Sequence, residues 1–245
     1  MKVLVTGASG FAGSVAAREL ALAGHAVTGL YRHRTRFLAT LDGVPGVTLA
    51  CGDLVAVGDL AGAFDAVVHT AATSPAPGID ARRMVHDNVR GTEALLDAAE
   101  RWTVRAFVLY SSLSIYGTVT APVVDEATPV VDPDPYGTTK WLCELMLKDR
   151  AERLPGLALR LPGVLGPGAH RNWLSGVAAR LSRGGTIGAF HLDSPFNNAA
   201  HVADIAALAV RAIALPWTGF DAVVLGARGA MPVREVVARL ASGLG

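Results

Sequence analysis

Short β-branched runs alternate with longer helical stretches along almost the whole chain, and this alternation restricts the fold more than any other feature. Strands and helices that alternate in this way form a parallel sheet with crossover helices on its faces. We therefore expect an α/β fold with a doubly wound parallel sheet. The strands are expected at residues 2–6, 26–31, 47–51, 66–69, 106–112, 157–161 and 222–226. The helices are expected at 11–23, 80–101, 135–153, 202–214 and 232–242, with a loop over 113–133.

The charge balance and the hydrophobic pattern exclude several classes of protein. Lys and Arg number 22 and Asp and Glu 21, and the net charge of +1 offers no footprint for nucleic acid or an anionic membrane. No apolar run approaches the ~20 residues of a spanning helix, and the N-terminus does not resemble a secretory signal. Cys51 and Cys143 lack metal-ligand spacing and are expected to be buried thiols. We expect a cytoplasmic enzyme or binding protein without a metal.

A glycine cluster follows the first expected strand directly. The segment TGASGFAG contains Thr6, Gly7, Gly10 and Gly13 and opens the first helix. Glycines allow a tight turn and a close approach of pyrophosphate to the backbone, and helix N-termini favour negative charge. The Gly-x-x-Gly-x-x-Gly spacing differs from the Gly-x-Gly-x-x-Gly dinucleotide fingerprint. It indicates either a phosphate site or merely a tight strand-to-helix turn.

The end of the second expected strand carries Arg32, in the run Tyr31-Arg32-His33-Arg34. In a dinucleotide site an acid here accepts hydrogen bonds from the ribose of NAD, whereas an arginine suits the 2′-phosphate of NADP. If the chain binds a dinucleotide, we expect NADP(H) to be favoured over NAD(H). Arg32 could also stack on adenine or belong to a solvated basic surface. Asp53, after the third strand, could accept from the adenine amino group.

Tyr136 and Lys140 lie four residues apart in YGTTK, so they share one face of the expected helix 135–153. A neighbouring ammonium favours phenolate and lowers the pKa of a tyrosine from about 10, which makes it a usable general acid/base. Ser111 and Ser112 end an expected strand upstream. Because ligands bind at the carboxyl ends of parallel strands, a serine there could hydrogen-bond a reacting oxygen.

Taken together, eight segments resemble the extended branch of the short-chain dehydrogenase/reductase superfamily, which contains sugar-nucleotide epimerases, dehydratases and reductases. They follow the family order over nearly the whole chain. The segments are TGASGFAG at 6–13, GDL at 52–54, VVHTAA at 67–72, NVRGT at 88–92, SSLSIYG at 111–117, YGTTK at 136–140, LRLPGVLGPG at 159–168 and HVADIA at 201–206. The resemblance implies a Rossmann fold, an NAD(P) cofactor and hydride transfer at a carbonyl or alcohol carbon of a small molecule.

The resemblance also implies roles for single residues. Tyr136 would be the acid/base, Lys140 would lower its pKa and hold the nicotinamide ribose, and Ser112 would be the catalytic serine. Ser111 and Ser114 are the alternatives for that serine. The implied cofactor contacts are Gly7, Ser9, Gly10, Phe11, Gly13, Arg32, Asp53, Leu54, Ala71, Asn88, Tyr136, Lys140, Pro162 and Val164. Three further residues are expected to be structural: His69, His201 and Asp204.

Two departures from the family pattern narrow the function. Dehydratases carry Asp-Glu after the catalytic residue, whereas this chain has Leu113 and Ser114, so sugar dehydration is not expected. The expected substrate portion, 163–198 plus 226–245, is also short beside the dinucleotide-binding portion, 1–162 plus 199–225. Its pocket is expected to be small, open or completed by a partner chain, such as the second copy of a homodimer. Arg171, Asn172 and Trp173 lie where diphosphate or sugar contacts would fall.

These observations favour an NAD(P)-dependent epimerase or 4-keto reductase of a nucleotide-linked sugar. Two alternatives stay open: a reductase of a non-sugar ketone, and a non-catalytic protein that senses a dinucleotide. Sensors of this kind commonly lose the tyrosine or the lysine, and this chain keeps Tyr136 and Lys140.

Overall fold

The structure is a computed structural model and describes residues 1–216 and 218–244. The chain divides into two compact units, and each is described by itself. The first comprises Met1–Arg160 and Ala203–Val224, and the second comprises Leu161–Val202 and Leu225–Gly245. The roles expected of the two portions, dinucleotide binding and substrate binding, stay predictions.

The first unit is built on a seven-stranded parallel sheet, which confirms the expected Rossmann-type fold. Its strands are β1 (Lys2–Thr6), β2 (Ala26–Tyr31), β3 (Val47–Cys51), β4 (Ala66–His69), β5 (Ala106–Ser112), β6 (Gly156–Leu161) and β10 (Phe220–Val224). They lie in the order β10-β6-β5-β4-β1-β2-β3. The direction of the strand order reverses between β1 and β4, and open α/β sheets bind ligands at the carboxyl ends beside such a switch point.

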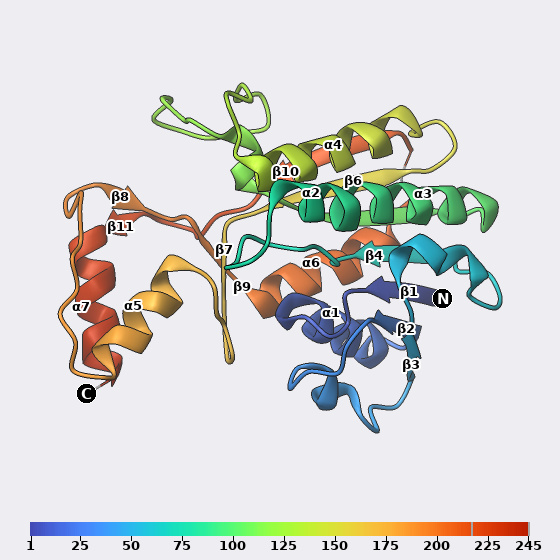
Figure 1. Ribbon diagram of the computed structural model, residues 1–245, viewed down its shortest axis with the longest axis horizontal. Coiled ribbons are helices and arrows are strands. Elements are labelled where there is room, and N and C mark those ends of the chain that lie inside the picture. The colour runs from blue at the N-terminus through green and yellow to red at the C-terminus, as the bar shows by residue number, and fades with distance from the viewer. Residues whose placement is uncertain (217, 245) are drawn as a thin grey trace. The chain divides into compact units, whose positions relative to one another are not determined.

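Helices cover both faces of this sheet (Figure 1). α1 (Phe11–Leu22) and α6 (Val202–Ala214) lie on one face, and α3 (Gly91–Arg101) and α4 (Pro135–Asp149) lie on the other. Alternate strand residues and helix residues three or four apart meet in the layer between the sheet and α3 and α4. Its buried members include Leu4, Val67, Leu95, Leu96, Phe107, Leu109, Cys143 and Leu147.

The helix expected over 80–101 is interrupted. α2 (Ala81–Met84) passes into a π-helical turn, Val85–Arg90, and α3 begins only at Gly91. π turns are short, wide insertions that often lie at functional sites. Apolar periodicity did not predict this one. Among the residues that the structure describes, no helix is both long enough and apolar enough to cross a bilayer.

The second unit contains two small sheets and two helices. β7 (Gly163–Leu165) pairs with β9 (Ala199–His201), and β8 (Pro195–Phe196) pairs with β11 (Met231–Pro232). α5 (Trp173–Leu181) packs on α7 (Val233–Leu244). α5 was not predicted, because Gly and Pro surround it. Its start is nevertheless encoded locally, since Asn172 and Ser175 form a reciprocal capping box.

The two cysteines differ in environment. Cys143 is buried, but Cys51 is exposed, so the expectation that both thiols are buried is wrong for Cys51. Cys51 is the last residue of β3, which is an edge strand of the sheet. A residue at the end of an edge strand has a neighbouring strand on one side alone, so it is less buried than a cysteine usually is.

His69 is a buried structural residue, as the sequence predicted. It lies on β4 with 1 % of its surface exposed. Its Nδ1 is 2.6 Å from Thr6 Oγ1, and its Nε2 is 2.8 Å from Thr92 Oγ1. Burial, and to a smaller extent the charge of Lys140, lowers the pKa of His69 to about 3. The imidazole is therefore neutral in the folded protein at physiological pH.

This neutral histidine makes stability depend on pH. Between pH 6.5 and about 3 the unfolded chain binds a proton at His69 that the folded chain excludes. The free energy of unfolding should therefore fall as the pH is lowered through this window, by up to about 1.4 kcal/mol per pH unit. Urea unfolding at about pH 7, 6 and 5 measures the slope. His69→Gln should flatten it, and an equal slope in this variant would contradict the assignment.

Candidate functional site

A pocket of about 250 Å³ lies in the first unit, where β1, β2, β3 and β4 end. Several of the predicted cofactor contacts line it: Gly7, Ser9, Gly10, Arg32, Asp53, Leu54 and Ala71. The sequence analysis missed other lining residues: Leu30, Tyr31, His33, Thr35, Gly52, Thr70, Ala72, Thr73 and Asp87. Most of these are direct neighbours of predicted residues at strand ends. The predicted ends of the strands could therefore have indicated them. Asp87 is different, since it comes from the unpredicted π turn.

The glycine loop forms a bare backbone wall of the pocket. Gly7 has a φ of +72°, and a Cβ on it would lie 2.7 Å from the backbone nitrogen of Ala71. A Cβ on Gly13 would lie 2.2 Å from the carbonyl oxygen of Gly7, so α1 can pack closely on the loop. Such a loop at a helix N-terminus fits a pyrophosphate. Phe11 and Gly13 lie behind it in the first turns of α1, and the Phe11 ring centroid is 5.7 Å from that of Phe37.

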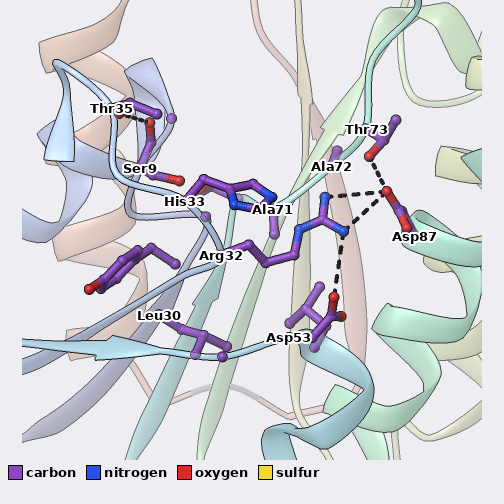
Figure 2. A pocket seen from close by; sticks show the side chains of 16 residues that line it. Ser9, Leu30, Arg32, His33, Thr35, Asp53, Ala71, Ala72, Thr73 and Asp87 are labelled. Atoms are coloured by element: carbon purple, nitrogen blue, oxygen red, sulfur yellow. Dashed lines mark hydrogen bonds and ion pairs between the residues drawn. The ribbon is translucent and has the colours of Figure 1, made fainter. Parts of the chain in front are cut away.

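Arg32 bridges two carboxylates at the rim of the pocket. Its Nη1 lies 3.6 Å from Asp53 Oδ2, and its Nη1 and Nη2 both lie 3.2 Å from Asp87 Oδ2. Figure 2 shows the guanidinium between these two acids, at the end of a side chain that extends from β2. The positive charge expected to face a 2′-phosphate is therefore already paired within the protein.

Asn88, the next residue of the π turn, is buried and ties the pocket to the helix α4. Its Oδ1 accepts from the Thr73 amide at 2.7 Å, and its Nδ2 donates to the Thr73 carbonyl and to Thr139 Oγ1. Thr73 lines the pocket, and Thr139 lies on α4 beside Lys140. Asn88 is not among the residues that line the pocket, and its expected contact with a cofactor stays a prediction.

Tyr136 and Lys140 occupy the predicted helix face. Tyr136 lies in the first turn of α4, near Ser74, which follows the pocket residue Thr73. Burial raises the pKa of Tyr136 more than the Ser74 hydrogen bond lowers it. The pKa of the phenol is therefore raised overall, and the role expected of Lys140 beside it stays a prediction. Lys140 is 2 % exposed, and burial lowers its own pKa. Burial is the largest cause of both pKa shifts.

The two strand-end serines have different environments. Ser112 ends β5 and caps the short turn Leu113–Tyr116, with its Oγ 3.1 Å from the Ser114 amide and 3.1 Å from Ser114 Oγ. Ser111 is 3 % exposed and donates to the carboxylate of Glu144. Successive residues of a strand point to opposite faces. Ser112 therefore stays the candidate for the catalytic serine, and Ser111 has a structural partner.

Local sequence brings α4 to the turn that follows Ser112. Asp134 caps the helix by accepting from the Gly137 amide at 2.7 Å, and Pro135 is the first helical residue. A Cβ on Gly137 would lie 2.1 Å from the Ser114 carbonyl oxygen. The glycine after Tyr136 is therefore required for close packing between the two segments that carry the catalytic candidates.

A buried ion pair beside these candidates was not predicted. Glu144 lies one helical turn after Lys140, is 2 % exposed and pairs with Arg160 of β6 at 2.9 Å. Arg160 also donates to the Tyr116 hydroxyl at 2.7 Å and to the Glu126 carbonyl at 3.2 Å. The pair therefore anchors the loop after Ser112. Its sequence signal was the spacing of Tyr136, Lys140 and Glu144, which repeats every four residues along one helix face.

The remaining predicted residues are not among those that line this pocket. Pro162 and Val164 belong to the second unit, where Asn172 Nδ2 donates to the Val164 carbonyl at 2.8 Å. Asn172 thus has a structural role at the start of α5, and the Trp173 ring centroid is 5.4 Å from that of Phe196. The others are placed by their elements: Arg171 immediately before this cap, His201 at the end of β9 and Asp204 in the first turn of α6.

Comparison with known proteins shows the family to which this chain belongs. The chain matches the model of the NAD dependent epimerase/dehydratase family over residues 3–226. It is 34% identical over 181 residues to a UDP-glucose 4-epimerase of Streptomyces lividans. The aligned region covers 69% of this chain and 54% of that protein. The chain spans about half the length of the curated relatives it matches.

Solved structures show the same fold. MoeE5 in complex with UDP-glucose and NAD is 27% identical, with a TM-score of 0.83 over 99% of this chain and 81% of that one. WbmH of Bordetella bronchiseptica in complex with NAD⁺ is 26% identical, with a TM-score of 0.81 over 97% of this chain and 79% of that one.

The close packing at Gly137 can be tested by a single methyl group. Gly137→Ala forces the first turn of α4 away from Ser114, so it should destabilise the protein by about 1–3 kcal/mol. The same substitution at Gly176, inside α5, should stabilise by about 0.5–1 kcal/mol, because among the described residues the added methyl would meet no atom within 4 Å beyond its own stretch of helix. Unfolding of both variants in urea measures the difference. A Gly137→Ala protein as stable as the wild type would show that the contact does not constrain the helix.

Proposed function

Because this chain belongs to the NAD dependent epimerase/dehydratase family, we propose that it is an NAD(P)-dependent enzyme acting on a nucleotide-linked sugar. The proposed reaction is hydride transfer at a keto or hydroxyl carbon, in an epimerase or a 4-keto reductase. The observation that carries this proposal is the glycine-walled pocket at the switch point, with Tyr136 near Ser74, the residue after the pocket residue Thr73. The substrate class rests on the named relatives, which include a UDP-glucose 4-epimerase and a complex with UDP-glucose and NAD.

The residues around the pocket fit a dinucleotide. Gly7, Ser9 and Gly10 would hold the pyrophosphate, because they line the pocket at the N-terminus of α1, where backbone amides favour negative charge. Asp53 and Leu54 would lie by the adenine. The bound cofactor supplies or accepts the hydride.

The proton chemistry belongs to residues of this chain. Burial keeps the pKa of Tyr136 above its ordinary value, so the phenol is protonated at neutral pH and able to donate to a carbonyl oxygen. In the opposite direction the same oxygen accepts the proton of a hydroxyl. Ser112 would hydrogen-bond the reacting oxygen, and Lys140 would bind the nicotinamide ribose. Leu113 and Ser114 lack the acids of a dehydratase, which favours epimerisation or reduction.

The choice of cofactor depends on Arg32. The sequence predicts NADP(H) over NAD(H) from this arginine, and we keep that preference as a proposal. The named complexes contain NAD, and Asp53 and Asp87 already contact the guanidinium that a 2′-phosphate would need. The preference should therefore be smaller than a free arginine would produce.

Three finer assignments complete the proposal. The second unit would bind the sugar nucleotide, with Pro162 and Val164 beside the nicotinamide. A second copy of the chain in a homodimer would complete the small substrate portion. The enzyme would work in the cytoplasm.

Substitutions at the catalytic candidates test the mechanism. Tyr136→Phe should lower turnover about 10²–10⁴-fold while dinucleotide affinity changes little, because the ring stays and only the proton donor is lost. Lys140→Ala should be worse, since it also loses a ribose contact. Ser112→Ala should fall between the wild type and Tyr136→Phe. Steady-state kinetics on nucleotide-linked 4-keto sugars, with calorimetry for dinucleotide binding, measures both effects.

Ser111→Ala is the matched control for Ser112→Ala, because Ser111 ends the same strand but bonds to Glu144. This variant should change the free energy of unfolding, while its turnover and its dinucleotide affinity change less. Near-normal turnover by Tyr136→Phe would refute the mechanism. Dinucleotide binding without turnover of any sugar nucleotide or ketone would support the sensor instead.

Cofactor retention separates the two proposed reactions. An epimerase restores its cofactor within each cycle, so oxidised dinucleotide should stay bound to the purified protein. A net reductase must exchange its cofactor each cycle, so NADPH or NADH should be consumed stoichiometrically with the ketone. Mass spectrometry of the denatured protein and absorbance during turnover measure these outcomes. Consumption of reduced cofactor in proportion to product would exclude the epimerase.

A further inference from the structure

We propose that Asp87 sets the cofactor preference of this enzyme by holding Arg32, so that its carboxylate competes with a cofactor 2′-phosphate for the guanidinium. The inference rests on the proposed dinucleotide site and adds a positioning residue to it. Asp87 lies outside the glycine loop and outside the strand ends that indicated a cofactor. It comes from the π turn, 55 residues after Arg32 in the chain.

The two partners differ in mobility. Asp87 is fixed, since its side chain is 5 % exposed and its Oδ2 accepts from Thr73 Oγ1 at 2.6 Å and from Arg83 Nε at 2.8 Å. Arg32 is a long side chain, 37 % exposed, that reaches Asp87 from the end of β2. Figure 2 shows Thr73 and Arg32 meeting the carboxylate from different sides. Any ligand that needs the guanidinium must therefore compete with Asp87 for Arg32, because Asp87 cannot follow.

The carboxylate is ionised throughout the working range of pH. Burial by itself would raise the pKa of Asp87, but hydrogen bonds from Thr73, Arg83, His86 and Arg32 together lower it well below its usual value. Asp53 adds a second negative charge 3.6 Å from the same guanidinium. The competition with a phosphate is thus present at every physiological pH.

NAD and NADP meet this arrangement differently. The ribose of NAD carries a 2′-hydroxyl, which leaves the Arg32–Asp87 contact intact. The 2′-phosphate of NADP is recognised by an arginine fork, which here must separate from one carboxylate or share it. The phosphate also faces the charges of Asp53 and Asp87. The contact therefore disfavours NADP(H) relative to NAD(H), whatever the preference of the wild type.

A double-mutant cycle tests this coupling. Dissociation constants for NAD⁺ and NADP⁺ are measured by calorimetry on the full chain for the wild type, Asp87→Asn, Arg32→Ala and the double variant. Asn keeps the shape of the side chain and its acceptor for Thr73. Asp87→Asn should raise the affinity for NADP⁺ relative to NAD⁺ by about 5- to 10-fold, the worth of one partly desolvated ion pair. In the Arg32→Ala background the same change should alter the ratio by less than about twofold.

Two further variants guard the result. Asp42→Asn is the matched control, because Asp42 pairs with the neighbouring Arg34 at 2.7 Å and neither residue lines the pocket. It should leave the ratio unchanged. Arg83→Gln removes another cation from Asp87 and leaves Arg32 more tightly held, so it should shift the ratio toward NAD⁺. This variant tests the idea even if Asp87→Asn does not fold.

The outcomes separate this inference from the proposed function. Binding of both dinucleotides with a ratio that Asp87→Asn does not change would overturn the inference alone. A shift of equal size with and without Arg32 would also overturn it, since the effect would then not pass through the arginine. Failure of the wild type to bind either dinucleotide would overturn the proposed function, and the inference with it.

Discussion

The buried ion pair between Glu144 and Arg160 joins the elements on which the candidate site depends. Glu144 lies on α4 and Arg160 on β6, while Ser111 of β5 and Tyr116 of the following turn bond to the pair. Removal of one partner of such a pair costs about 3–5 kcal/mol, because the other charge stays buried without compensation. The helix that carries Tyr136 is thus held by charge as well as by apolar packing.

A second polar connection holds the same helix from the side of the pocket. Thr139 of α4 bonds to Asn88, and Asn88 bonds to both backbone polar groups of Thr73. Together with Glu144, these contacts place an unusually polar helix face in a buried interface. That burial explains why the pKa of Tyr136 is raised and that of Lys140 is lowered.

The rim of the pocket follows a different principle. Arg32, Asp53 and Asp87 there are close enough to satisfy one another. A charged ligand must compete with these internal contacts, so ligand preference depends on their strength. The identity of Arg32 alone is therefore not sufficient to deduce the cofactor, and its partners matter equally.

The sequence by itself determined the order and type of the main elements, the glycine turn and the site of each catalytic candidate. These features depend on neighbours in the chain: apolar alternation marks β1 to β6, Asp134 and Pro135 start α4, and strand ends carry the polar residues. Only the tertiary structure decided the π turn, the exposure of Cys51, the partners of Arg32 and Glu144, and the direction of the pKa shift at Tyr136. Arg32 and Asp87 are 55 residues apart, and desolvation is a property of the packed interior. Local sequence patterns cannot predict the contact between Arg32 and Asp87 or the desolvation of Tyr136, because both arise only when distant segments pack together and exclude water.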